Sequence, residues 1–177
     1  MQKFVNLCDR LSQGCGTVAG IMMLIGLALV IIEIIIRSLF DMTLYITEEY
    51  TGYLMAAITF LALSYTLKEK GHIRLTFFNT VLKGKARLIL DMYAFAVGLL
   101  VSILITITTT RLFWDSVVSQ TRSMQISETY LAIPQFFIPL GALVLALQFA
   151  AELGRAIIKM RSGRVKEQEV ESSSLGR

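Results

Sequence analysis

The chain has 177 residues, of which 55% are hydrophobic and 17% are charged, whereas about a quarter of the residues in soluble domains are charged. This composition excludes an ordinary soluble protein. One histidine, His72, and two cysteines, Cys8 and Cys15, are too few for a membrane haem held by two histidines or for a zinc site of cysteines and histidines. The net charge of +4 arises from basic residues beside the apolar segments, so we expect them to bind anionic membrane phospholipids and not nucleic acid.

Four stretches of the chain contain no Asp, Glu, Lys, Arg or His: residues 11–32, 50–67, 92–110 and 129–151. Each is long enough to cross a bilayer core of about 30 Å as a helix that rises about 1.5 Å per residue. With their flanks they predict transmembrane helices over about residues 14–38, 48–68, 88–112 and 129–158. We therefore expect an all-α integral membrane protein, with a single four-helix domain over residues 1–161.

Ahead of the first span, apolar residues recur at spacings of three and four, which places them on one helical face: Phe4, Leu7, Cys8, Leu11 and Cys15. This pattern predicts a short amphipathic helix over about residues 2–13 that lies in the membrane interface. The apolar run that follows is too long for a removable signal peptide, so we expect it to be retained as a helix.

The first span carries two pairs of residues that could meet a partner helix. Gly16 and Gly20 have the GxxxG spacing that permits close helix approach. Glu33 and Arg37 are four residues apart and can pair on one helical face near the end of the span. Glu33 is a candidate partner contact or, alternatively, the coupling carboxylate of a four-helix exporter. Pairing with Arg37 would hold it ionised and weaken the second interpretation.

The second span begins with Glu48 and Glu49, which follow Thr47. The structural interpretation is that Thr47 is the N-cap of the helix and that the two acids lie at the positive end of the helix dipole. A functional interpretation, compatible with the first, is an acidic outer patch that docks a partner. After this span, an apolar stripe followed by basic residues predicts a second interfacial helix over about residues 74–84, and a partly ordered loop is the alternative.

The last span contains both prolines of the chain, Pro134 and Pro139, followed by Gly141. Because proline lacks a backbone N–H, we expect Pro134 in the first turn of this span, and we expect Pro139 to kink the helix or open it locally. Such breaks form ion sites in some transporters, but the other spans have no matching break, so an ion site here is not favoured. Beyond it, residues 162–177 are rich in glutamate and serine and predict a disordered tail.

The positive charges are divided unequally between the two sides of the predicted bundle. Arg37, Arg111 and Arg122 would lie on one side, and the remaining lysines and arginines on the other. The positive-inside rule then places both termini in the cytoplasm. Acids near the span ends have a basic residue three or four positions away, so we expect neutralised pairs and nominate no catalytic, substrate-binding or metal-binding residue. These pairs are Glu33–Arg37, Arg87–Asp91, Arg111–Asp115 and Glu152–Arg155.

Five short segments, taken in their order along the spans, resemble those of a known family of membrane proteins. They are residues 48–49, 59–65, 70–74, 132–134 and 137–141. They resemble the small membrane subunit, also called the DctQ-type or small permease subunit, of tripartite ATP-independent periplasmic (TRAP) transporters. The motif residues in the last three segments are Gly71, His72, Arg74, Pro134, Pro139 and Gly141. In physical terms, Gly71 to Arg74 form a helix exit, where glycine can cap the helix and arginine can reach phosphates.

The resemblance implies a multi-pass protein of the bacterial inner membrane that works in a three-part uptake system. A periplasmic binding protein would deliver an organic acid to a large elevator-type subunit, which would bind both the substrate and sodium. The small subunit would brace the large one as a heterodimer in this symporter. It would have no enzymatic activity and no cofactor of its own.

Under this interpretation, the candidate contacts with the large subunit are Gly16, Gly20, Glu33 and Arg37, and the candidate docking residues for the periplasmic protein are Glu48 and Glu49. The alternatives are an autonomous small multidrug exporter of four helices and an unrelated membrane adaptor. The identity of the organic acid is left open, because its contacts would lie in other chains.

Overall fold

The computed structural model describes residues 2–69 and 85–161, which are almost entirely helical. The helices are α1 (Gln2–Phe40), α2 (Tyr45–Lys68), α4 (Lys85–Val118), α5 (Ala132–Gln135) and α6 (Phe137–Arg161). Within this part of the chain, α1, α2, α4 and the combined α5–α6 segment are long and apolar enough to cross a membrane. The prediction of an all-α membrane protein with four spans is therefore confirmed. The predicted interfacial helix over residues 74–84 and the predicted tail over 162–177 lie outside the described residues.

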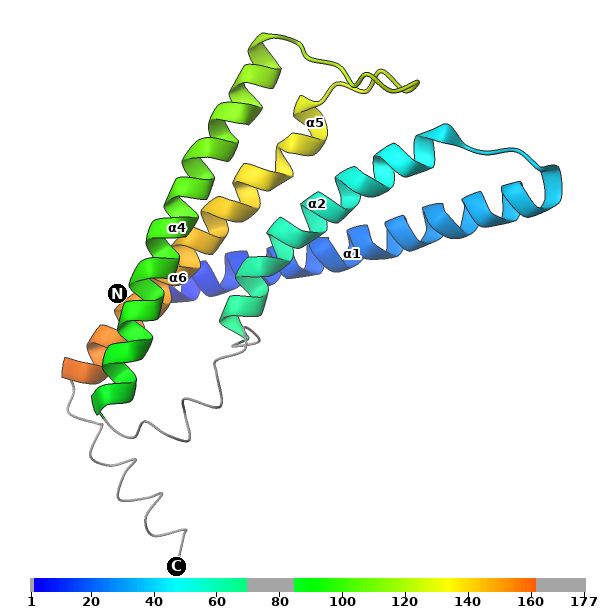
Figure 1. Cartoon of the computed structure of the whole chain (residues 1–177). Helices are drawn as coiled ribbons and strands as arrows, with labels where there is room; N and C mark the ends of the chain where they lie inside the picture. Colours follow the sequence, from blue (N-terminus) through cyan, green and yellow to red (C-terminus); the bar gives the residue numbers. More distant parts are fainter. Residues whose placement is uncertain (1, 70–84, 162–177) are drawn as a thin grey trace, which may run out of the picture.

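The helices form two hairpins, α1 with α2 and α4 with α5–α6 (Figure 1). The turn of the first hairpin begins at Asp41, whose φ of 51° is left-handed and reverses the chain directly after α1. The hairpins lie together where α1 and α4 begin and α2 and α6 end, which we name the terminal end. They diverge toward the opposite end, which holds both hairpin connections and which we name the loop end.

Helix α6 is the centre of the bundle, because it packs against α1, α2 and α4. In the most apolar stretch of the α5–α6 span, 39% of the residues are buried, against 6% in the most apolar stretch of α1. The main core cluster joins the two hairpins and contains Leu67 of α2, Phe95 of α4, and Leu145 and Ala156 of α6. The apolar side chains of α1 therefore face mostly outward, where lipid or another protein would cover them.

Helix α1 is continuous over 39 residues, although the sequence suggested an interfacial helix over 2–13 and a separate span over 14–38. The first turns stay in line with the rest because Val5 and Cys8 pack against Ala151 of α6. At a rise of about 1.5 Å per residue, α1 is about 58 Å long, about twice the thickness of a bilayer core. It is therefore too long to fit within that core along the membrane normal.

The backbones of the two hairpins lie close together at Gly141. A Cβ atom placed on this glycine would lie 2.6 Å from the carbonyl carbon and oxygen of Phe60 in α2. Only glycine lets the backbones of α6 and α2 come this near, because any side chain would collide with backbone atoms that cannot rotate away.

The prolines divide the last span into α5 and α6. The interruption falls at Phe136, close to Pro139, because proline cannot donate to the carbonyl four residues earlier and its ring crowds that carbonyl. Phe136 keeps right-handed helical dihedral angles, and Leu140 N donates to its carbonyl over a long 3.4 Å. The span therefore keeps its direction despite the break.

Candidate functional site

The predicted ion pair between Glu33 and Arg37 is not formed. Arg37 is exposed, and Glu33 Oε2 is buried without a hydrogen-bond partner among the described residues. Arg111 and Asp115 are both exposed and likewise form no ion pair in the described part of the chain. These two predictions were wrong because a pair of this spacing contributes only about 0.3–0.5 kcal/mol, too little to fix two long side chains. The side chain of Arg87, the predicted partner of Asp91, lies outside the described residues.

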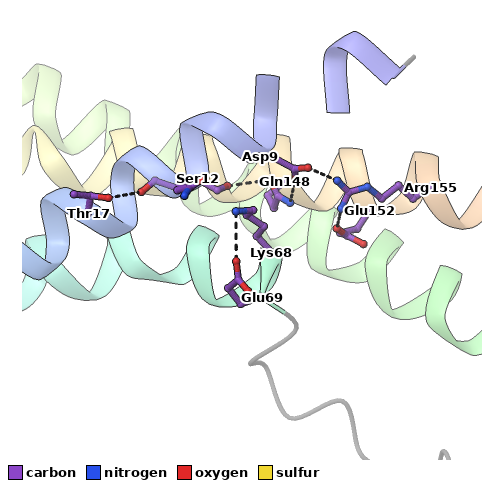
Figure 2. A network of polar contacts seen from close by, with 9 residues as sticks. Asp9, Ser12, Thr17, Lys68, Glu69, Gln148, Glu152 and Arg155 are labelled. Carbon is purple, nitrogen blue, oxygen red and sulfur yellow. Dashed lines mark hydrogen bonds and ion pairs between the residues drawn. The ribbon is translucent and has the colours of Figure 1, made fainter. Parts of the chain in front are cut away.

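The predicted pair of Glu152 and Arg155 is confirmed, and it belongs to a larger group that we name the terminal cluster (Figure 2). Arg155 of α6 also forms an ion pair with Asp9 of α1. The Gln148 amide donates to Asp9 Oδ1 over 3.1 Å and accepts a hydrogen bond of 2.9 Å from the Ser12 hydroxyl. The cluster therefore joins the start of α1 to the end of α6 through both charged and neutral groups.

The terminal cluster follows from helix periodicity. Positions 148, 152 and 155 lie on one face of α6, and positions 9 and 12 lie on one face of α1. Ser12 and Gln148 are fully buried, so each needs the hydrogen bond that the other provides. Sequence reasoning missed Asp9, Ser12 and Gln148. The available signal was Gln148, because an amide side chain within an apolar run typically bonds to a neighbouring helix in membrane proteins.

The two glycines of the GxxxG pair have different surroundings. A Cβ atom on Gly16 would lie 2.6 Å from the ring of Tyr65, so this glycine serves the contact between α1 and α2 inside the chain. Outside its own helical turn, no described atom lies within 4 Å of a Cβ placed on Gly20, which is exposed. Of the two, Gly20 is the one that has space for a partner helix.

At the loop end, the two adjacent acids of α2 point in different directions. Glu48 is exposed in the first helical turn, whereas Glu49 is only 6% exposed. The Tyr53 hydroxyl donates to Glu49 Oε1 over 2.6 Å, and the Ser127 hydroxyl donates to Glu49 Oε2. Glu49 is therefore engaged within the chain, and Glu48 is the carboxylate that faces outward. The predicted N-cap at Thr47 was wrong, since α2 begins at Tyr45 and Leu44 occupies the cap position.

The motif residues that the structure describes lie near the break in the last span and at its contact with α2. Pro134 is in α5, Pro139 is in the first turn of α6, and Gly141 meets α2. Gly71, His72 and Arg74 lie outside the described residues. Across residues 2–69 and 85–161, no three His, Cys, Asp or Glu side chains gather closely enough to hold a metal ion.

The model of a family described as "Tripartite ATP-independent periplasmic transporters, DctQ component" matches residues 26–159, which is more than half of the chain. The matched part begins within α1, after Gly16 and Gly20, and contains Glu48, Glu49 and the break in the last span. No curated protein and no solved structure matches the chain.

Proposed function

Because the chain belongs to the DctQ component family of tripartite ATP-independent periplasmic transporters, it is a small membrane subunit of such a transporter, and we propose that it braces the large elevator-type subunit. In this role it supports sodium-coupled uptake of an organic acid that a periplasmic binding protein delivers. The sodium and substrate sites belong to the large subunit. The family match over residues 26–159 is the observation that carries this proposal.

The distribution of apolar surface supports a bracing role. The core gathers along α6, while α1 exposes large apolar side chains along most of its length, among them Ile21, Leu24 and Ile35. Gly20 lies on this exposed side and offers space for a closely packed neighbour. We assign the outer face of α1 to the large subunit, with Gly20 and the half-buried side chain of Glu33 as contacts.

The polar contacts also support a brace. The terminal cluster links α1 to α6, and Glu49 links α2 to residue Ser127 beyond α4, so these charged groups hold the helices of the chain to one another. A subunit that keeps a fixed shape gives a moving partner a constant surface to work against.

We further propose that the terminal end faces the cytoplasm and the loop end faces the periplasm. The positive-inside rule supports this orientation, since the loop end carries few basic residues. Lys3 and Arg10 are exposed at the terminal end, where they would bind anionic phospholipids. Glu48 would then face the periplasmic binding protein.

Copurification and transport together test the proposed function. A tagged form of this chain should copurify with the large subunit after both are expressed in one membrane. Proteoliposomes with both subunits, the binding protein and a sodium gradient should accumulate one member of a panel that includes sialic acid and dicarboxylates. Proteoliposomes with this chain alone should accumulate none. Sodium-driven uptake by this chain alone would overturn the assignment.

A further inference from the structure

Helix α4 lies at the edge of the bundle and packs mainly against α6 (Figure 1). Its inner face carries Ser102, which is buried, and Gly98, where a Cβ atom would lie 2.5 Å from the ring of Phe149 in α6. The opposite face is exposed from Tyr93 to Trp114, and its residues recur at every third or fourth position, so they form one row along the helix. We name this row the outer stripe. Its apolar residues between the two ends are Val97, Leu100, Leu104 and Ile107.

The outer stripe has an aromatic residue at each end. Tyr93 is 69% exposed, and Trp114, the only tryptophan of the chain, is 63% exposed. They are 21 residues apart, which is about 32 Å along a helix and close to the thickness of a bilayer core, about 30 Å. Tyrosine and tryptophan are enriched where the hydrocarbon meets the head groups, because each ring is apolar but carries one polar group. The spacing therefore fits one ring at each surface of a bilayer.

The polar groups on the exposed side of α4 need no partner from another protein. The hydroxyls of Thr108 and Thr110 donate to the carbonyls four residues earlier in their own helix, over 3.0 Å and 2.6 Å. Arg111 is the only charged residue between the two aromatic ends of the outer stripe. It lies about one turn inside Trp114, and its long side chain can extend to the head groups. Polar groups in contact with hydrocarbon have to be satisfied in these ways.

The exposed faces of α4 and α1 differ in a feature that separates lipid from protein. Contacts between membrane helices favour small residues, which let two backbones approach, whereas lipid chains gain nothing from them. The one glycine of α4 is Gly98, and it faces α6. The exposed side of α4 therefore has no glycine, whereas α1 exposes Gly20. This difference favours lipid at α4 and a protein helix at α1.

The packing of α4 on α6 gives the same position in the bilayer. Gly98 and Phe149 are level with each other, because they are in contact. The two helices run in opposite directions, so Tyr93, five residues before Gly98, is level with the turn that holds Glu152 and Arg155. These are the first two charged residues of α6. The terminal cluster therefore lies at the depth of the head groups, where charged side chains are tolerated.

We propose that the outer stripe of α4 faces lipid, in the isolated chain and in the transporter, and that it sets the depth of the subunit in the membrane. Trp114 then lies at one surface of the bilayer. Leu104, ten residues and about 15 Å away from it, lies near the bilayer centre. The large subunit covers α1 and leaves α4 in lipid, and this last part rests on the proposed function.

The depth can be measured on the isolated chain, because Trp114 is a single native fluorophore. The chain is reconstituted in vesicles of phosphatidylcholine that carries bromine either near the head group or near the end of one acyl chain. Bromine quenches a tryptophan only on contact. Trp114 should lose more emission with the shallow bromine. Leu104→Trp, in a chain that also carries Trp114→Phe, should lose more with the deep bromine.

Two further variants, also combined with Trp114→Phe, form a matched pair at one depth. Tyr93→Trp lies on the outer stripe and should be quenched by the shallow bromine, whereas Phe95→Trp replaces a buried ring and should be quenched little by either lipid. Absence of quenching in Leu104→Trp would mean that protein, such as a second copy of the chain, covers the outer stripe. That result would overturn the proposal, as would an equal or reversed depth order for the probes at 104 and 114. This order decides the depth even where Phe95→Trp does not fold.

The complex is tested with a nitroxide, because any tryptophan of the large subunit would add to the fluorescence. Cys8 and Cys15 are replaced by alanine, and a labelled cysteine replaces either Leu104 on α4 or Leu24 on α1, both of which are exposed. In nanodiscs, binding of the large subunit should leave the access of oxygen to the label at 104 unchanged and should lower it at 24. Lower access at 104 would show that protein covers the outer stripe and would overturn the proposal.

The two experiments separate this proposal from the proposed function. If the complex forms and oxygen access stays unchanged at both labels, the outer stripe faces lipid as proposed, and only the assignment of α1 to the large subunit fails. If the large subunit does not copurify with the unaltered chain, the proposed function fails. The quenching of the isolated chain then decides by itself whether the outer stripe faces lipid.

Discussion

Replacing Gly141 by alanine would place a methyl group against the backbone of α2, where the two hairpins are in close contact. The new Cβ atom would lie 2.6 Å from the carbonyl carbon of Phe60 and 2.9 Å from the amide nitrogen of Leu61. Carbon atoms normally meet at about 3.5 Å or more, so the shortfall is about 1 Å. Since the opposing atoms belong to a helix backbone, the two helices have to move apart or α2 has to deform.

The magnitude follows from two opposing effects. Overpacking of a close contact costs about 1–3 kcal/mol, whereas alanine in place of glycine favours a helix by about 1 kcal/mol. We expect Gly141→Ala to lower the free energy of unfolding by up to about 2 kcal/mol. Gly154→Ala on the same helix is the matched control, because no described atom outside its own helical turn lies within 4 Å of a Cβ placed there.

The measurement is unfolding of the purified chain in mixed micelles, with circular dichroism recorded as the fraction of denaturing detergent is raised. Gly154→Ala should unfold at the same or a higher detergent fraction than the unaltered chain, and Gly141→Ala should unfold at a lower one. Equal midpoints for the two variants would refute the reasoning, because they would mean that α2 and α6 do not touch through backbone at Gly141.

Three further predictions concern the two ends of the bundle. Gln148→Leu leaves the buried Ser12 hydroxyl without its acceptor, so we expect the free energy of unfolding to fall by about 1–3 kcal/mol in the same assay, and an unchanged midpoint would contradict this. Glu33→Gln should weaken copurification with the large subunit while leaving the unfolding midpoint of the isolated chain unchanged, and full copurification would remove Glu33 from the interface. The third prediction concerns orientation and uses a chain whose native cysteines are replaced. A cysteine introduced in place of Gln125 should react with a membrane-impermeant thiol reagent added to spheroplasts. A cysteine introduced in place of Asn6, which is also exposed, should not react. The reverse pattern would invert the topology.

Several features of the terminal cluster show how far sequence reasoning reaches. The pair of Glu152 and Arg155 was predictable because three residues along a helix fix their distance. The partnership of Arg155 with Asp9 was not, because these residues are far apart in the sequence and meet only when α1 crosses α6. Spacing also gave two wrong pairs, Glu33–Arg37 and Arg111–Asp115, since it permits a contact without making it favourable.

The adjacent acids of α2 show the same limit. Nothing in the local sequence distinguishes Glu48 from Glu49 as the outward-facing residue, since both suit the start of a helix. Neighbouring helical residues point about 100° apart, so at most one of them faces a given neighbour. Ser127 decides that Glu49 is the one, and it lies on a segment that follows α4.

The sequence by itself determined that the chain is a helical membrane protein with four spans and that it resembles a small TRAP transporter subunit. Hydropathy and helix length are properties of contiguous residues, and they can be judged without knowing what any residue touches. Only the tertiary structure decided that α6 is central, that Gly16 packs inside the chain while Gly20 stays open, and that Glu49 accepts a hydrogen bond from Ser127. Those outcomes depend on which faces of distant helices meet, and that choice is made by packing between segments and not within them.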